Sequence, residues 1–174
     1  MPPRYNLARR KAQEVLRQGK IKSAPVPVET LARLLGAAIR LEPFPGELSG
    51  MVMRRPDGTA VIGVNSIEGP TRQRFTIAHE LGHLLMHRDE DVHVDERFPF
   101  AFRDPKSSKA IDDKEIEANQ FAAELLMPES LLRKDLKDVD LDIETDDMVA
   151  KLAAKYQVST QAMTFRLSRL GVVR

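Results

Sequence analysis

Two histidines, His79 and His83, stand four residues apart, and Glu80 directly follows the first of them. On an α-helix this spacing places both imidazoles on one face, one turn apart, where both rings can reach a single metal ion. Imidazole is a preferred ligand of Zn²⁺, and a carboxylate beside the ion can take a proton from a water that the ion activates. The spacing therefore predicts a hydrolytic zinc site, with His79 and His83 as ligands and Glu80 as the general base.

A catalytic zinc ion usually has three protein ligands and one open position, so a further donor is needed. The sequence contains no cysteine, which leaves histidine, aspartate and glutamate. We expect Glu115 to be this donor, because it shares a helical face with Ala118 and Asn119, and a small alanine lets two helices approach closely. Glu117 is the alternative, but it lies about 200° around the helix from Glu115. Together with Gln120 it is expected to face solvent.

Further polar residues have supporting roles that the sequence leaves open. Asn119, one turn beyond Glu115, is predicted to hydrogen-bond a ligand histidine and fix its tautomer, although helix-surface polarity is the alternative. His87 continues the four-residue series, but helical drift moves it about 80° from His79, which disfavours it as a ligand. His93 is either a donor to a tetrahedral oxyanion or a loop histidine without a role.

The elements around these residues follow from hydrophobic spacing and turn signals. Helices are predicted at residues 7–18, 28–35 and 112–127, and another, carrying the metal motif, starts near Gly69-Pro70-Thr71. Strands are predicted at residues 38–41, 48–54 and 59–65, and residues 55–58 should form a tight hairpin. The exposed edge of this sheet can hold an extended peptide by strand addition or remain a capped structural edge. Residues 88–112 are expected to form a loop or lid over the site.

One glycine inside the predicted metal helix indicates how that helix packs. Gly82 costs about 1 kcal/mol in a helix interior relative to alanine. This cost is easier to understand if another backbone must come close at that point. We therefore expect a strand or helix to cross the metal helix at Gly82.

The composition excludes several classes of protein. The chain has 174 residues, of which 42% are hydrophobic and 30% charged, as is usual for a globular protein with one main core. Its net charge of +1 provides no strong overall attraction to nucleic acid or membranes. The sequence shows no apolar signal core and no run of about 18 apolar residues. With no cysteine either, a cytoplasmic protein without a membrane partner is expected.

The chain resembles the ImmA/IrrE family of bacterial and phage metallopeptidases in two segments, FTIAHELGHLLMH at residues 75–87 and EIEANQFAAELLMP at residues 115–128. Shorter similarities at residues 49–52, 63–65 and 72–75 extend the resemblance to roughly residues 25–135. The resemblance implies a zinc peptidase with a compact gluzincin-like fold, in which His79, His83 and Glu115 bind the metal and Glu80 is the base. It also implies a substrate class, because the studied members cleave helix-turn-helix repressors encoded beside them.

The last part of the chain has a pattern of its own. Residues 147–155 and 160–170 are predicted helices joined by a short turn, with Ser159 as the cap of the second, which resembles a helix-turn-helix. Gln161, Thr164 and Arg166 are among the polar residues that such a helix would turn toward DNA. However, residues 145–174 contain five basic and two acidic residues, which is little charge for binding phosphates. We favour a helical pair that packs on the peptidase or docks its repressor, and DNA binding is the alternative.

These observations predict an α+β fold in which a small antiparallel sheet packs on a helical zincin-like core, followed by a C-terminal helical pair resembling a helix-turn-helix. Residues 1–140 would form the metallopeptidase domain and residues 141–174 the helical segment. The predicted function is zinc-dependent, or manganese-dependent, hydrolysis of a peptide bond in a partner protein, a helix-turn-helix transcriptional repressor. The rival hypothesis is a non-catalytic regulator with a closed or vestigial zinc site that binds DNA or protein.

Overall fold

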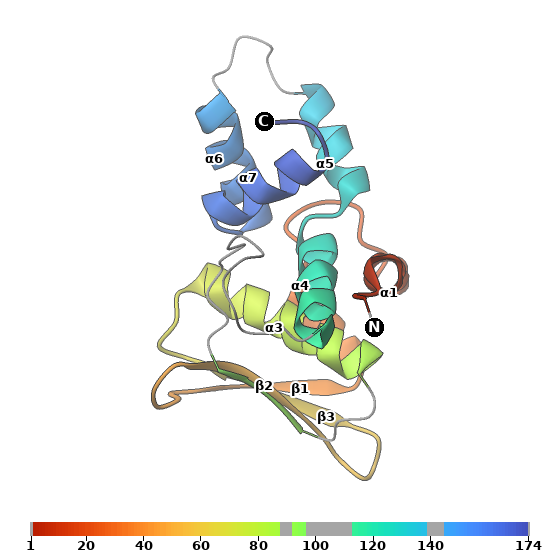
Figure 1. Ribbon diagram of the computed structural model, residues 1–174, viewed down its shortest axis with the longest axis vertical. Coiled ribbons are helices and arrows are strands. Elements are labelled where there is room, and N and C mark those ends of the chain that lie inside the picture. Colours follow the sequence, from red (N-terminus) through yellow and green to blue (C-terminus); the bar gives the residue numbers. More distant parts are fainter. Residues whose placement is uncertain (1, 88–91, 97–112, 139–144, 174) are drawn as a thin grey trace.

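The structure, a computed structural model, describes residues 2–87, 92–96, 113–138 and 145–173. In chain order its elements are α1 (Tyr5–Gln18), α2 (Val28–Leu34), β1 (Ala37–Glu42), β2 (Leu48–Arg54), β3 (Ala60–Asn65), α3 (Pro70–Met86), β4 (Val92–Glu96), α4 (Asp113–Leu126), α5 (Glu129–Asp135), the short 3₁₀ helix η1 (Leu136–Asp138), α6 (Thr145–Tyr156) and α7 (Thr160–Arg169). The sheet lies at one end of the molecule, α3 covers it, α4 packs on α3, and α5, α6 and α7 gather at the other end (Figure 1). The predicted α+β class is confirmed.

The described strands form a four-stranded sheet in the order β1-β3-β2-β4. β2 and β3 are antiparallel and joined by the predicted hairpin, in which Gly58 has a φ of +85° and its N–H donates to Arg55 O. β4 pairs antiparallel with β2, whereas β1 pairs parallel with β3. After β1 the chain passes the position of β3 before it forms β2, so that β3 lies between β1 and β2. The sheet is therefore mixed rather than purely antiparallel.

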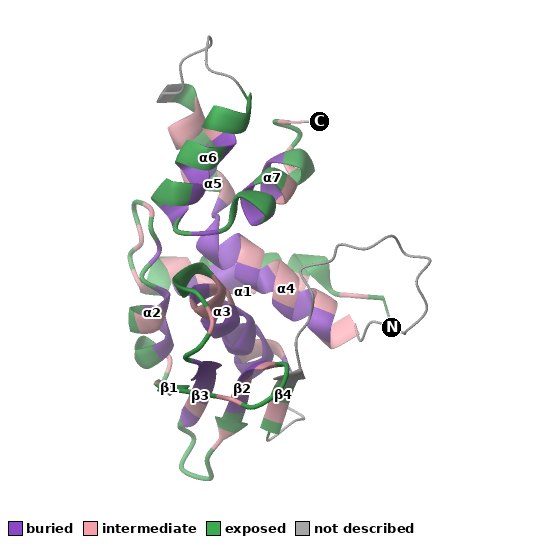
Figure 2. Ribbon diagram, turned by 90° about the vertical axis from the view of Figure 1, so that its left-hand side faces the viewer, coloured by how far each residue is buried: buried purple, intermediate pink, exposed green. Residues whose placement is uncertain are grey.

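One face of the sheet packs against α3, as the buried residues between them show in Figure 2. Val52, Ile62 and Val64 point to this face and are at most 4% exposed, and Ile77 and Leu81 meet them from α3. The outward positions are more open, with Met53 at 42% exposure. This alternation is the period of two that places one face of a strand in the core, and it fixes which strand residues can reach α3.

α3 and α4 cross at Gly82, where a close backbone approach was predicted. A Cβ added to Gly82 would stand 3.0 Å from Ala118 Cα and 3.2 Å from Phe121 Cδ1, both on α4. Small residues on both helices thus allow a separation that larger side chains would prevent. The prediction is confirmed, and the crossing brings the side chains of the two helices into one site.

The C-terminal helices pack on α4 and α5 through buried contacts. Arg166 of α7 makes a bidentate ion pair with Glu124 of α4, at 2.8 and 2.6 Å, and its Nε donates to Met127 O at 3.0 Å. Ser159 caps α7, as predicted, by accepting a hydrogen bond from Ala162 N–H. Among the described helices, none combines the length and the apolar character that crossing a bilayer requires.

The segment expected to be a loop or lid, residues 88–112, contains a strand instead at Val92–Glu96. The rest of the lid prediction lies outside the described residues. β4 occupies the edge next to β2, so it extends the sheet on the side that faces the metal motif.

Candidate metal centre

α3 is the platform of the candidate site. It begins after Gly69, whose extended backbone precedes Pro70 at the first helical position, and it runs through the core with His79, Glu80 and His83 all at most 1% exposed. Four residues apart on one face, His79 and His83 place their Nε2 atoms 3.1 Å from each other. The helical spacing of the motif therefore brings the two ring nitrogens to one point.

α4 adds a carboxylate at the same point. Glu115 Oε2 lies 3.2 Å from His79 Nε2, and Glu115 Oε1 lies 3.1 Å from His83 Nε2. Glu115 is 8% exposed, and it reaches the histidines because α4 crosses α3 closely. The ligating atoms of His79, His83, Glu115 and also His93 lie within 4.8 Å of one another, whereas Glu117 is outside this cluster.

Glu80 follows His79 on α3, and its side chain lies between α3 and the sheet. Its side chain is fully buried, and a Cβ added to Gly50 of β2 would stand 3.4 Å from Glu80 Oε1. Glycine at this position lets β2 pass close to α3, because an added Cβ would stand only 2.3 Å from Thr76 Cγ2. The carboxylate that directly follows the first histidine is therefore held in the protein interior, between α3 and β2.

Asn119 lies where the sequence predicted a partner for a histidine. Its Oδ1 is 3.1 Å from His79 Nδ1. An amide oxygen only accepts hydrogen bonds, so His79 donates through Nδ1 and carries its lone pair on Nε2. That lone pair faces Glu115 Oε2, and electron-rich atoms at this separation repel unless a cation lies among them. The donor set thus fits a divalent metal ion, with two imidazole nitrogens and one carboxylate.

The protonation states point the same way. Burial lowers the pKa of His83 from 6.5 to about 4, so this imidazole is neutral near pH 7. A neutral imidazole is the form that binds metal.

His93 was expected in a loop, and this was wrong. It lies in β4 opposite Val52, so its side chain points to the α3 face, with 15% exposure. Its Nε2 is 3.2 Å from Glu115 Oε1, and its ring stacks on His83 with centroids 3.5 Å apart and planes 13° apart. The alternation of Val92, His93 and Val94 was the sequence signal for a strand.

The stacking limits what His93 can do. An imidazole binds a metal through a lone pair in the plane of its ring, and two rings stacked face to face cannot both hold one ion in their planes. With His83 and Glu115 facing each other in the cluster, His93 therefore flanks the donor set as a side wall of the site.

The prediction that Glu117 faces solvent was also wrong. Glu117 is 2% exposed, because the start of α1 covers this side of α4. Its carboxylate accepts hydrogen bonds from Arg4, and its Oε2 lies 3.0 Å from His87 Nε2. His87 is 2% exposed and, in keeping with the sequence, is not among the clustered donors. Arg4 carried no sequence signal, since nothing in a local pattern links it to a helix 113 residues away.

A strand residue fixes the end of α3. Arg54 of β2 donates from Nη2 to the carbonyl oxygens of His83, Leu84 and His87, at 3.2, 2.8 and 3.0 Å. These carbonyls are at the helix C-terminus, where partners within the helix run out and a positive charge is favourable. The sheet and the metal helix are thus joined at the turn that carries His83.

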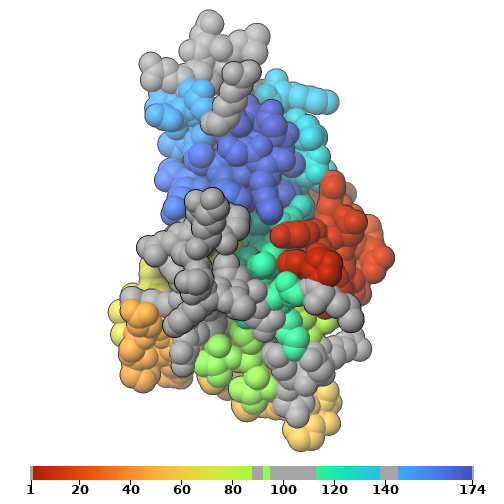
Figure 3. Space-filling view, in the orientation of Figure 1, coloured from red at the N-terminus to blue at the C-terminus, as the bar shows by residue number. Residues whose placement is uncertain are grey.

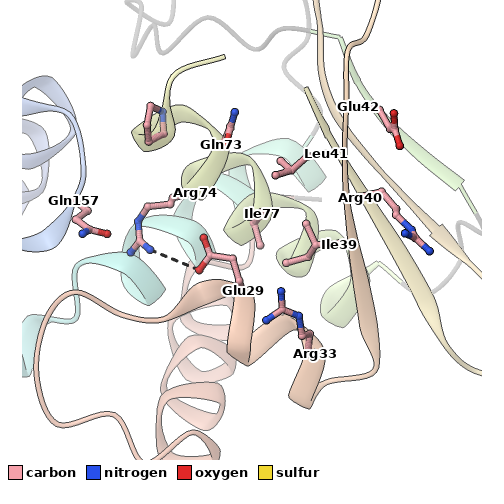
Figure 4. Close-up of a pocket in the computed structure, with 11 residues that line it drawn as sticks. Glu29, Arg33, Ile39, Arg40, Leu41, Glu42, Gln73, Arg74, Ile77 and Gln157 are labelled. Atoms are coloured by element: carbon pink, nitrogen blue, oxygen red, sulfur yellow. Dashed lines mark ion pairs between the residues drawn. The ribbon is translucent and has the colours of Figure 1, made fainter. Parts of the chain in front are cut away.

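A separate hollow lies at the β1 edge of the sheet, lined by α2, β1 and α3 (Figure 4). Arg74 faces Glu29 there at 3.8 Å and donates from Nη2 to Val26 O at 2.8 Å. The lining of the hollow includes both acidic and basic side chains, and none of the clustered histidines. The hollow is therefore distinct from the candidate metal centre.

Comparison with known proteins identifies the family. The family model described as the IrrE N-terminal-like domain of peptidase M78 matches residues 32–168, which is most of the chain. The chain therefore belongs to this ImmA/IrrE family of metallopeptidases, as the resemblance implied.

Two curated relatives and one solved structure are similar to the chain. The radiation response metalloprotease IrrE of Deinococcus radiodurans is 33% identical over 108 residues, covering 62% of this chain and 30% of that protein. The metallopeptidase ImmA of Bacillus subtilis is 29% identical over 105 residues, covering 60% of this chain and 54% of that protein. A structure described as a Mycobacterium tuberculosis transcriptional regulator matches with a TM-score of 0.59 and 18% identity, over 92% of this chain and 46% of that one, and shows a shared fold. The matches span about half or less of each relative's length.

Proposed function

We propose that this chain is a zinc-dependent endopeptidase that acts in the cytoplasm on a partner protein, a helix-turn-helix transcriptional repressor. The observation that carries the proposal is the convergence of His79 Nε2, His83 Nε2 and the Glu115 carboxylate within 3.2 Å of one another, with Glu80, which follows His79 on α3, fully buried. The names of the relatives IrrE and ImmA, both metallopeptidases, support the reaction class.

His79, His83 and Glu115 would hold the ion. A Zn²⁺ ion held there would supply a Lewis acid for a peptide carbonyl and would bring the pKa of a water molecule toward about 7, because two neutral imidazoles and one carboxylate offset only one of its charges. Mn²⁺ is the alternative occupant, because histidine and carboxylate ligands also suit it.

Glu80 would move the proton. Its carboxylate accepts the proton of the attacking water and then delivers it to the amine that leaves when the peptide bond breaks. Burial keeps this carboxylate away from bulk water, so the proton it takes up is delivered within the site.

β4 would align the substrate. It is at the edge of the sheet among the described strands, with Val92 and Val94 pointing outward at 50% and 45% exposure. An extended segment of the partner protein can pair with such an edge through main-chain hydrogen bonds. The pairing would carry the peptide past His93, whose N–H can donate to the carbonyl oxygen where negative charge develops.

The C-terminal helical pair would be a supporting segment of the peptidase rather than a DNA reader. Arg166, the basic side chain expected to reach DNA, is 4% exposed and paired with Glu124. Arg169 contacts Gln120 of α4 and lies over the rings of Tyr5 and Phe165. With Arg166 buried and the exposed Arg169 engaged by Gln120 and two aromatic rings, α7 offers little charge for phosphate contacts. We therefore retain residues 1–140 as the peptidase domain and residues 141–174 as a segment packed on it.

The test is incubation of the purified protein with the product of a neighbouring repressor gene, with zinc or manganese, and with a chelator as control. Wild type is expected to cut the repressor only when metal is present, and Glu80→Gln is expected to bind metal but not cut. Absence of cleavage in every condition, together with salt-sensitive DNA binding, would favour the non-catalytic regulator.

A further inference from the structure

A line of polar contacts, buried except at Arg4, runs from the candidate metal centre to the start of α1. His83 Nδ1 lies 3.0 Å from His87 Nδ1, on the side of the ring away from the cluster. His87 Nε2 lies 3.0 Å from Glu117 Oε2. Arg4 completes the line, donating to Glu117 from Nε at 2.9 Å, from Nη2 at 2.8 Å and from its backbone N–H at 2.7 Å. In the space-filling view the red N-terminal segment lies beside the teal α4 (Figure 3).

The order of donors and acceptors along this line is determined by its outer end. Arg4 only donates, and an ionised Glu117 only accepts, so the proton between Glu117 and His87 belongs to His87 Nε2. When His87 carries a single proton, its lone pair is on Nδ1, and this atom can only accept. His83 must therefore carry its proton on Nδ1, which leaves the lone pair of His83 on Nε2, the atom that faces Glu115 and His79.

Arg4 keeps Glu117 in the form that this order requires. Three N–H groups of Arg4 donate to the two carboxylate oxygens, at 2.7, 2.9 and 2.8 Å, and the guanidinium charge beside them favours the ionised form. Glu117 therefore accepts the hydrogen bond from His87.

We propose that His87, Glu117 and Arg4 are positioning residues that hold His83 in the Nδ1–H tautomer, with its Nε2 lone pair directed at the cation. The proposal rests on the metal-binding role assigned to His83 above. Asn119 does the same for His79 through a single hydrogen bond at 3.1 Å. α4 therefore contributes a donor to the ion and also sets the tautomers of both histidines of α3. Arg4 lies outside residues 32–168, the segment matched by the family model.

The direct test reads the tautomer in metal-free protein at pH 7.5, using long-range proton–nitrogen correlation spectra of ¹⁵N-labelled protein. Wild type is expected to show His83 protonated at Nδ1. His87→Phe removes the acceptor, and His83 is expected to become a mixture of tautomers. His87→Asn is expected to restore the Nδ1–H form, because the amide oxygen of asparagine stands close to the position of Nδ1. The proposal is overturned if wild-type His83 is protonated at Nε2, or if His87→Phe leaves the tautomer unchanged.

A second measurement uses zinc affinity, by competition with a chromogenic chelator. Glu117→Ala and His87→Phe are expected to weaken zinc binding by about 10- to 100-fold, the usual effect of losing a partner of a ligand histidine. Arg9→Ala is the matched control, since Arg9 also joins α1 to a distant glutamate, at 2.6 Å from Glu129 Oε2, without touching the cluster. It should bind zinc as wild type does. Unchanged affinity in Glu117→Ala and His87→Phe would overturn the proposal.

The two measurements separate this inference from the proposed function. If wild type binds no zinc, the metallopeptidase proposal fails, and the tautomer spectra still decide whether the line of contacts acts on His83. If wild type binds zinc and Glu115→Ala does not, the metal site stands, and only the variants at positions 87 and 117 bear on the positioning role. Thermal melts of each variant show whether it is folded.

Discussion

Replacing Arg166 by alanine tests whether the C-terminal helices are part of the peptidase fold. Arg166 and Glu124 are 4% and 8% exposed and form a bidentate pair, and Arg166 Nε also satisfies Met127 O. Arg166→Ala leaves the Glu124 carboxylate buried without its charged partner, with only Gln120 still donating to it. Breaking a buried pair in this way costs about 3–5 kcal/mol of the free energy of unfolding. For a chain of this length the melting temperature should fall by about 6–20 °C.

The assay is urea unfolding followed by circular dichroism, supported by thermal melts. Arg133→Ala is the matched control, because Arg133 pairs with Glu129 at 2.7 Å but is 56% exposed, and such pairs contribute about 0–1 kcal/mol. The double variant Arg166→Met with Glu124→Leu is expected to recover most of the loss, since apolar residues can replace a buried ion pair.

A cost of less than about 0.5 kcal/mol for Arg166→Ala, as is usual for a surface residue, would refute the reasoning. Arg166 would then face solvent, and DNA binding by α7 would regain support. The result also bears on the metal site, because the same helix, α4, carries Glu124 at one end and Glu115 at the other.

Three further outcomes are expected. His93→Ala should keep the zinc affinity of wild type and reduce kcat by about 10²- to 10³-fold, as the loss of an oxyanion donor does. If this variant lost zinc instead, His93 would be a metal ligand. Gly82→Val should lower the free energy of unfolding by about 1–3 kcal/mol in chemical denaturation, because Ala118 Cα stands 3.0 Å from the added Cβ, and unchanged stability would contradict the close crossing. In metal-free protein, burial holds the pKa of His83 at about 4 rather than 6.5. Between these two pH values His83 is protonated in the unfolded chain but neutral in the folded protein. The free energy of unfolding should therefore fall as the pH drops from 6.5 to 4. His83→Gln should flatten this dependence in urea titrations, and an equally steep slope would contradict the buried neutral state.

Local patterns were sufficient to predict most elements and which side chains of α3 and α4 come together. Helical spacing placed His79 and His83 on one face, and the face shared by Glu115 and Asn119 was inferred from α4 alone. Gly82 predicted the helix crossing, because glycine destabilises a helix interior and a close approach by another backbone explains its presence there. These are properties of single elements, and a sequence carries them directly.

What the sequence did not reveal depends on contacts between distant segments. Glu117 was assigned to solvent because its own helix gave no reason for burial, yet Arg4 and the start of α1 cover it. His93 was assigned to a loop because a strand of five residues inside a long connection gives a weak signal. The parallel pairing of β1 with β3 likewise follows from how the chain crosses the hairpin, not from the composition of β1.

Anomalous diffraction at the zinc absorption edge, from crystals grown with zinc, tests the central claim most directly. One ion is expected within about 2.0–2.2 Å of His79 Nε2, His83 Nε2 and a Glu115 oxygen, with its fourth position held by solvent. An ion bound by Glu117 instead, an ion elsewhere in the molecule, or a fourth position filled by a protein side chain would contradict the account.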